Sequence, residues 1–109
     1  MTKREWKKWV TDNAVILGRS GLTARQAAIL AKAYASSRSG NAGGRLYLPI
    51  ALPDGVPVAY DGEEVRDLEN RGLIRREISE SGARSITITE CGIEKLIEIF
   101  GSLNLDADP

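Results

Sequence analysis

Arginine is the residue type with the clearest chemical use in this chain. Arginines recur between residues 66 and 84, and one more stands at residue 45. A guanidinium group presents several N–H donors in a planar fork, which suits bidentate binding of phosphate or carboxylate groups. The candidate contacts to a nucleic-acid backbone are Arg45, Arg66, Arg71, Arg75, Arg76 and Arg84, together with the Ser81 hydroxyl.

Acidic residues in the same stretch allow a second interpretation of two of these arginines. Arg66 and Arg71 lie on a predicted helix that also carries Glu63, Asp67 and Glu69. Opposite charges three or four residues apart on a helix pair with each other, each pair contributing about 0.3 kcal/mol. The sequence leaves pairing and ligand binding equally open for these two arginines. For the three arginines that follow them, it favours contact with a partner.

Composition limits the other kinds of chemistry. The 109-residue chain has no histidine and one cysteine, and its 15 basic and 15 acidic residues give zero net charge. The usual general base and metal ligand are therefore missing, and no internal disulfide can form. We find no phosphate loop, metal-ligand spacing or paired nucleophile and base, so we expect neither an enzyme nor a bound cofactor or metal. Cys91 is expected to be a small, partly buried apolar residue.

The charge balance and the hydropathy also restrict partners and location. Dedicated nucleic-acid binders often carry a basic excess, so a neutral chain needs segregated charges to bind phosphates. No apolar run approaches the ~20 residues that span a membrane. The first ten residues lack the apolar core of a signal peptide. We expect a cytoplasmic protein with no membrane partner.

Two helices are predicted in the first part of the chain. Thr2 and Glu5 have capping-box spacing and open a helix over 2–17, which Gly18 and Gly21 end. Both tryptophans fall on one face of this helix. A second capping box opens an alanine-rich helix over 23–37, which we expect to be central and largely buried.

The remaining elements lie on either side of a glycine stop. The predicted order is a strand and turn segment over 45–60, a helix over 61–71, a hairpin over 73–89, a helix over 90–100 and an acidic tail over 101–109. Apolar residues alternate through the first of these, and its prolines restrict it to a sheet edge. Asp61 is the expected cap of the helix over 61–71, and Thr89 is the expected cap of the last helix.

The stretch from residue 61 to residue 100 resembles winged-helix transcriptional regulators of the multiple-antibiotic-resistance-repressor type. The matching residues are Leu68, Gly72, Leu73, Ile74, Arg75, Arg76 and the run Thr89-Glu90-Cys91-Gly92. The resemblance implies an α+β fold, a mostly helical winged-helix domain over 1–100. It implies a β-hairpin wing and flanking amino- and carboxy-terminal helices.

Two features depart from the pattern of that family. The helix that would enter the DNA major groove starts with Asp61, Glu63 and Glu64, whose carboxylates repel phosphates. Acids in the first turn also stabilise a helix dipole, so a structural role accounts for them. The segment over 45–60 is predicted as strand and turn, whereas the family has a short helix before the groove-entering helix.

Two functions follow from these observations. The first is a small DNA-binding protein, a transcriptional regulator that acts as a homodimer and contacts duplex DNA through its wing and helix. Its dimerisation residues would be Trp6, Trp9, Ile97 and Phe100, on the two amphipathic terminal helices. The alternative is a protein-interaction module, an adaptor or a phage- or mobile-element-type inhibitor that does not bind DNA, which the neutral charge and the acidic helix start favour.

Overall fold

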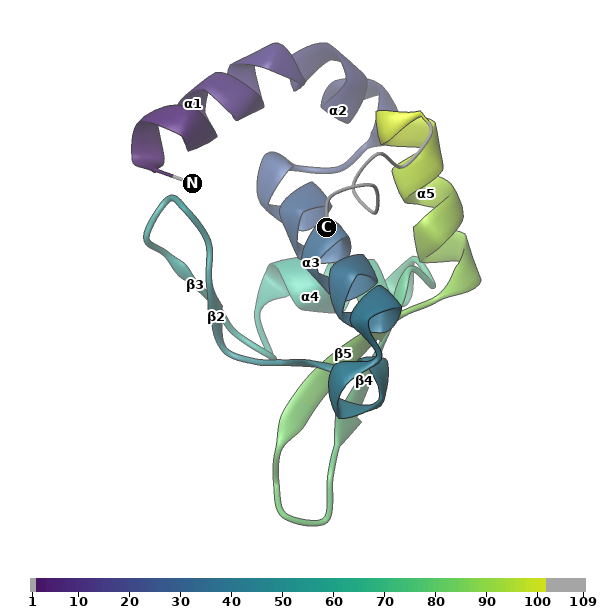
Figure 1. The fold of residues 1–109 in the computed structure, drawn as a ribbon. Helices are drawn as coiled ribbons and strands as arrows, with labels where there is room; N and C mark the ends of the chain where they lie inside the picture. The colour runs from purple at the N-terminus through teal and green to yellow at the C-terminus, as the bar shows by residue number, and fades with distance from the viewer. Residues whose placement is uncertain (1, 102–109) are drawn as a thin grey trace.

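Helices from both ends of the chain enclose a central helix, and a small antiparallel sheet projects away from them (Figure 1). The computed structural model describes residues 2–101. Its elements are α1 (Lys3–Asp12), α2 (Ala14–Ser20), α3 (Ala24–Ser39), the 3-10 turn η1 (Asn41–Gly44), β1 (Leu46–Tyr47), β2 (Ile50–Ala51), β3 (Pro57–Val58), α4 (Glu63–Asn70), β4 (Ile74–Ile78), β5 (Arg84–Ile88) and α5 (Glu90–Phe100). The predicted α+β class is confirmed. Across these residues, no helix has the length and apolar character needed to cross a membrane.

The first predicted helix is divided in two. Asn13 separates α1 from α2, with φ −106° and ψ 6°. Its side-chain amide donates a 2.8 Å hydrogen bond to the Trp9 carbonyl, and such a bond competes with the regular backbone pattern. A single helix over 2–17 is therefore wrong. Gly18 lies inside α2, and Gly21 alone, with φ 73°, ends that helix.

Helix α3 is the centre of the core. Its capping box is present, because Thr23 accepts from the Gln26 backbone and the Gln26 side chain accepts from the Thr23 backbone. Ile29 and Leu30 on this helix are completely buried. The helix ends at Ser39, two residues after the predicted end at residue 37. Buried residues from α2, α4, α5 and the strands complete the core, and the partly buried Trp9 of α1 packs against it.

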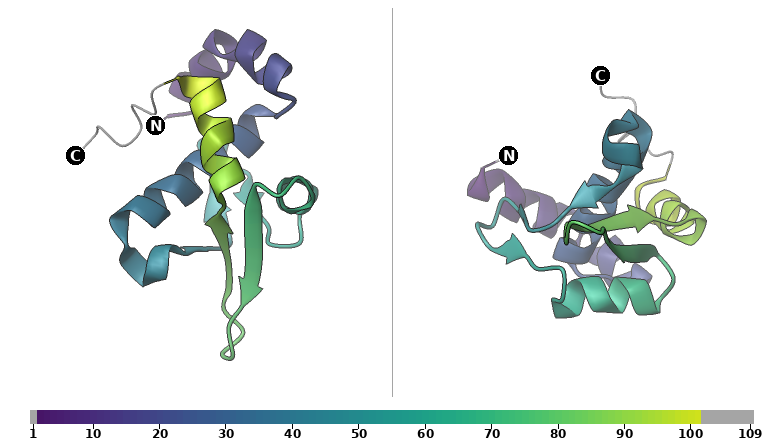
Figure 2. Two further views of the ribbon diagram at one scale, coloured as in Figure 1. Left: turned by 90° about the vertical axis from the view of Figure 1, so that its right-hand side faces the viewer. Right: turned by 90° about the horizontal axis from the view of Figure 1, so that it is seen from below.

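Three strands form the main sheet in the order β1-β5-β4, and all neighbours are antiparallel. The register pairs Ile74 with Ile88 and Arg76 with Ile86. Residues that face each other across strands share one face of a sheet, so Arg76 lies on the same face as the buried isoleucines but nearer the hairpin tip. The hairpin of β4 and β5 extends beyond the helical body in Figure 1 and in the left view of Figure 2.

The segment over 45–60 forms strands and turns, with β1 in the main sheet and β2 and β3 in a hairpin of their own. Leu52 and Val58 anchor this hairpin in the core, with exposed fractions of 3% and 1%. The Leu48–Pro49 peptide bond is cis. The tip of the hairpin reaches the amino end of α1 (Figure 1), and a Cβ built on Gly55 would lie 3.4 Å from Lys3 Cε.

The two helices beside the hairpin begin differently. Gly62 is the N-cap of α4 and makes no side-chain cap bond, so the prediction that Asp61 caps this helix is wrong. The Asp61 carboxylate is directed to arginines instead. Thr89 caps α5 as predicted, accepting a 3.1 Å hydrogen bond from the Gly92 backbone. Cys91 is exposed rather than partly buried.

One face of the carboxy-terminal helix packs into the core. Leu96 and Ile99 are its buried large side chains, whereas Ile97 is 46% exposed. Helix α5 runs from Glu90 to Phe100, within the predicted range. Apart from Gly101, the predicted acidic tail lies outside the described residues.

Candidate nucleic-acid interface

The outer face of α4 is the first part of the candidate interface. Val65 and Leu68 are completely buried and direct the opposite face of the helix to solvent. A shallow depression on that face is lined by Glu63, Arg66, Asp67 and Asn70. Asn70 was not among the predicted contacts. It lies four residues after Arg66, so the two side chains are neighbours on the same face of α4. An arginine and an amide are standard readers of base edges, while the two carboxylates repel phosphates.

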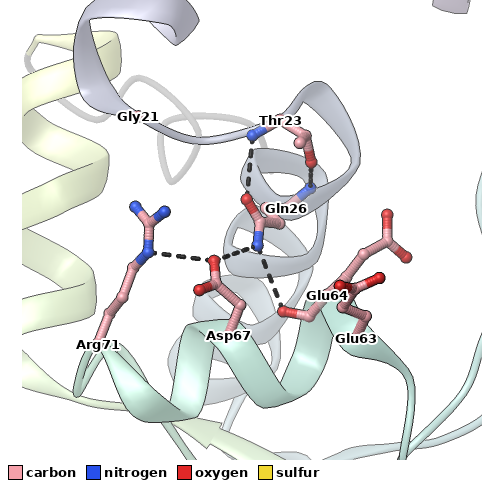
Figure 3. Close-up of a pocket in the computed structure, with 7 residues that line it drawn as sticks. All are labelled: Gly21, Thr23, Gln26, Glu63, Glu64, Asp67 and Arg71. Carbon is pink, nitrogen blue, oxygen red and sulfur yellow. Dashed lines mark hydrogen bonds and ion pairs between the residues drawn. The ribbon is translucent and has the colours of Figure 1, made fainter.

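A second cleft lies between α3 and α4 and contains Arg71 (Figure 3). Arg71 Nε lies 3.1 Å from Asp67 Oδ2, an ion pair that the sequence left open. The same carboxylate oxygen accepts a 2.7 Å hydrogen bond from Gln26 Nε2. Gln26 is only 5% exposed. Asp67 therefore joins the exposed arginine to the buried amide of α3, and Arg71 is partly committed to the fold.

Arg25 is a structural centre that the sequence reasoning did not single out. Its Nε donates to Glu64 Oε2 at 2.7 Å, and its Nη1 donates to Asp54 Oδ2. Longer bonds to the Val56 and Pro57 carbonyls complete its contacts, at 3.3 and 3.4 Å. One side chain of α3 thus fixes both the β2–β3 hairpin and the first turn of α4. The sequence feature that could have identified Arg25 is its position as a charged residue in the first turn of an alanine-rich helix that is largely buried.

The Asp54 contact predicts how stability depends on pH. The Arg25 guanidinium lowers the pKa of the Asp54 carboxyl below its ordinary value, and the Val56 backbone N–H, which donates to Asp54 Oδ1, lowers the pKa further. Because the unfolded chain then binds the proton more tightly, this stabilisation is present above the unfolded pKa of about 3.9 and is lost as pH falls through the folded pKa. Denaturant unfolding from pH 6 down to about pH 3 should show a smaller acid loss in Asp54→Asn than in the wild type. Equal losses in the two proteins would contradict the assignment.

Arg76, on the hairpin, is held by groups from the α4 region. Its Nε donates to Glu69 Oε1 at 2.9 Å, and its Nη1 donates to Asp61 Oδ1 at 3.3 Å. The same Nη1 lies 3.4 Å from the Tyr60 carbonyl oxygen. The guanidinium carbon lies 5.1 Å from the centre of the Tyr60 ring, within the range of a cation–π contact. The side chain is 24% exposed, so Arg76 joins the base of the hairpin to α4.

Arg84 reaches the same place from the opposite strand. Its Nη1 lies 3.7 Å from Asp61 Oδ2, and its guanidinium carbon lies 5.7 Å from the centre of the Tyr60 ring. Arg84 and Arg76 therefore share one carboxylate and one aromatic ring. We call these four residues, Tyr60, Asp61, Arg76 and Arg84, the hairpin-base cluster.

The other predicted contacts lie along the hairpin and beside it. Arg45 Nε is 3.5 Å from Glu77 Oε2. Ser81 is exposed at the hairpin tip, where its hydroxyl is 2.8 Å from that of Ser79. Arg75 is exposed on β4 and, like Arg66 on α4, forms no ion pair with any residue from 2 to 101.

Carboxylates thus accompany most of the predicted basic surface. Of the six arginines predicted as contacts, four pair with acids among residues 2–101, and two do not. Exposed pairs contribute little energy, so a phosphate can replace the carboxylate partner of an exposed arginine at small cost. The unpaired cations on α4 and β4 are the ones ready to bind an anion directly.

Three of the four predicted dimerisation residues make aromatic contacts within the chain, and the fourth is exposed. The Trp6 and Trp9 rings stack with centres 5.4 Å apart, and Trp9 lies 6.0 Å from Phe100. These aromatic contacts tie α1 to the end of α5 within one chain, and Trp6 is 9% exposed. Ile97 lies on the surface. Dimerisation through these residues stays a prediction.

No protein-family model, curated protein sequence or solved structure matches this chain. In the part of the chain from residue 2 to residue 101, no group of three or more cysteine and carboxylate side chains is arranged to hold a metal ion. The features of this chain that indicate a function are therefore the order of its elements and the arginines that they carry.

Proposed function

We propose that this protein is a winged-helix DNA-binding protein that regulates transcription. The observation that carries the proposal is the order α3, β1, α4, β4, β5, in which β1 closes the sheet against β5. This order resembles that of a winged helix, in which α4 would be the helix that enters the groove and the β4–β5 hairpin would be the wing. The β2–β3 hairpin takes the place of the short helix that usually precedes the groove-entering helix.

The exposed side chains of α4 and β4 support this role. Arg66 and Asn70 stand on the solvent face of α4, where they would meet base edges or phosphates. Arg75 would contact the phosphate backbone from the wing, with the Ser81 hydroxyl at the wing tip. A homodimer would place two such surfaces on adjacent half-sites, and we propose the exposed Ile97 face of α5 as part of its interface.

Removing the two unpaired arginines tests the proposal. We expect the double variant Arg66→Ala/Arg75→Ala to bind a labelled duplex of about 30 base pairs at least about tenfold more weakly at low salt. Its plot of log affinity against log salt should be less steep by about two, because each phosphate contact contributes roughly 0.9 to the slope. Fluorescence anisotropy at several salt concentrations measures both quantities.

The matched control for this titration is Arg19→Ala. Arg19 is an exposed arginine of α2, which lies at the opposite end of the molecule from the hairpin (Figure 1). Its replacement removes one positive charge, where the double variant removes two, and should leave affinity and salt slope close to those of the wild type. A folded wild-type protein that does not bind the duplex even at low salt would overturn the proposal.

A protein-interaction module is the second candidate. It is favoured by the carboxylates that accompany most of the arginines and by Glu63 and Asp67 on the exposed face of α4. A surface of alternating charges suits another protein better than it suits a phosphate backbone. Salt-insensitive binding to a protein partner that Arg66→Ala/Arg75→Ala weakens, together with no duplex binding, would select this candidate.

A further inference from the structure

The hairpin-base cluster places one carboxylate on two arginines at once. Asp61 directs Oδ1 to Arg76 and Oδ2 to Arg84, and these arginines come from the two strands of the wing. We propose that the arginine pair is a phosphate-binding site of the DNA interface and that Asp61 is its internal competitor. This inference rests on the proposed function and adds to it a limit on affinity that is part of the fold.

The geometry of the two arginines suits a phosphate group. The register places Arg76 opposite Ile86 and Arg84 opposite Ile78, so both side chains leave the same face of the sheet. Both guanidinium carbons lie within 6 Å of the centre of the Tyr60 ring, at 5.1 and 5.7 Å. Two oxygens of a phosphate are spaced much like the two oxygens of a carboxylate. A phosphate can therefore take the place of the Asp61 carboxylate with both arginines as donors.

The contacts of Asp61 with the two arginines are weak enough for a phosphate to displace its carboxylate. Its side chain is 70% exposed, and its distances to the two arginines are 3.3 and 3.7 Å. The Glu69 contact to Arg76 is shorter, at 2.9 Å, and comes from the opposite side of the guanidinium fork, at Nε. When Asp61 leaves, Glu69 still holds Arg76 in position. Asp61 precedes the α4 cap, so its rotation breaks no capping bond of that helix.

The test is the substitution Asp61→Asn, compared with Asp12→Asn. Asp12 is also an exposed aspartate in an ion pair, 2.9 Å from Lys8 on α1, and its replacement changes the net charge equally. We expect Asp61→Asn to bind the same duplex about fivefold more tightly at low salt, with a salt slope steeper by about one to two. Asp12→Asn should change neither. Adding Arg84→Ala to Asp61→Asn should remove most of the gain.

The outcomes separate this inference from the proposed function. Salt-dependent binding by the wild type, with no tighter binding by Asp61→Asn than by Asp12→Asn, overturns the inference and leaves DNA binding intact. Tighter binding by Asp61→Asn than by Asp12→Asn, lost again when Arg84→Ala is added, supports the inference. Absence of binding by all variants overturns both. Asp61→Ser serves as a second variant if circular dichroism shows that Asp61→Asn does not fold.

Discussion

Replacement of Gly92 by alanine is expected to lower the free energy of unfolding by about 3 kcal/mol or more. Gly92 is buried in the first turn of α5, where that helix packs against residues at the two ends of the β4–β5 hairpin. An alanine Cβ would lie 2.3 Å from the Leu73 carbonyl oxygen and 2.6 Å from Ile88 Cγ1. The carbonyl is backbone, and it accepts a 3.1 Å hydrogen bond from the Thr89 N–H, so it cannot move without breaking the junction of wing and helix.

Gly18→Ala is the matched control for this substitution. Gly18 lies inside α2, and a Cβ built on it meets no atom within 4 Å. Alanine has a higher helix propensity than glycine, so this variant should be more stable than the wild type by up to about 1 kcal/mol. Urea unfolding followed by circular dichroism measures both variants. If Gly92→Ala proves as stable as the wild type, the close approach of α5 to the wing is wrong.

Removal of the Arg25 side chain has the second largest expected effect. We expect Arg25→Ala to lower the free energy of unfolding by about 2 kcal/mol, because it leaves two partly buried carboxylates and two carbonyl groups without their donor. The Asp54 and Glu64 side chains are 22% and 32% exposed, so water can replace part of what they lose. The effect should therefore be smaller than that of breaking a fully buried pair. Lysine offers no fork, so Arg25→Lys should fall between alanine and the wild type.

An exposed ion pair of this chain provides the comparison for Arg25. Lys8 and Asp12 pair at 2.9 Å on α1, with side-chain exposures of 77% and 55%. Exposed pairs of this kind contribute little to stability, so Lys8→Ala should scarcely change the denaturant midpoint. Equal midpoints for Arg25→Ala and Lys8→Ala would show that the Arg25 contacts add no more than a surface pair.

The position of Arg25 also connects stability to the proposed function. Its guanidinium group contacts the first turn of α4 and the β2–β3 hairpin, which in the proposed winged helix would replace the usual short helix. A hairpin anchored by one arginine and by buried Leu52 and Val58 can position α4 in place of that helix. The carboxylate of Glu64, in the first turn of α4, thus serves the fold by holding Arg25.

Signals confined to a few residues predicted most of the elements of this protein. The capping box of Thr23 and Gln26 and the Thr89 cap are where the sequence predicts them, because a cap bond joins residues three apart. The hairpin over 73–89 follows from alternating side chains on either side of a small polar turn. The helix break at Asn13 has a local cause too, but asparagine inside a helical pattern is a weak signal.

Tertiary structure alone decided which charges far apart in the sequence meet. Arg25 finds Glu64 and Asp54 from positions 39 and 29 residues away, and Arg76 finds Asp61 from a distance of 15 residues. Periodicity cannot predict such pairs, because they depend on how α3, α4 and the wing pack against one another. For the same reason the sequence showed a row of arginines suited to phosphate, while the fold placed carboxylates beside most of them and left Arg66 and Arg75 unpaired within residues 2–101.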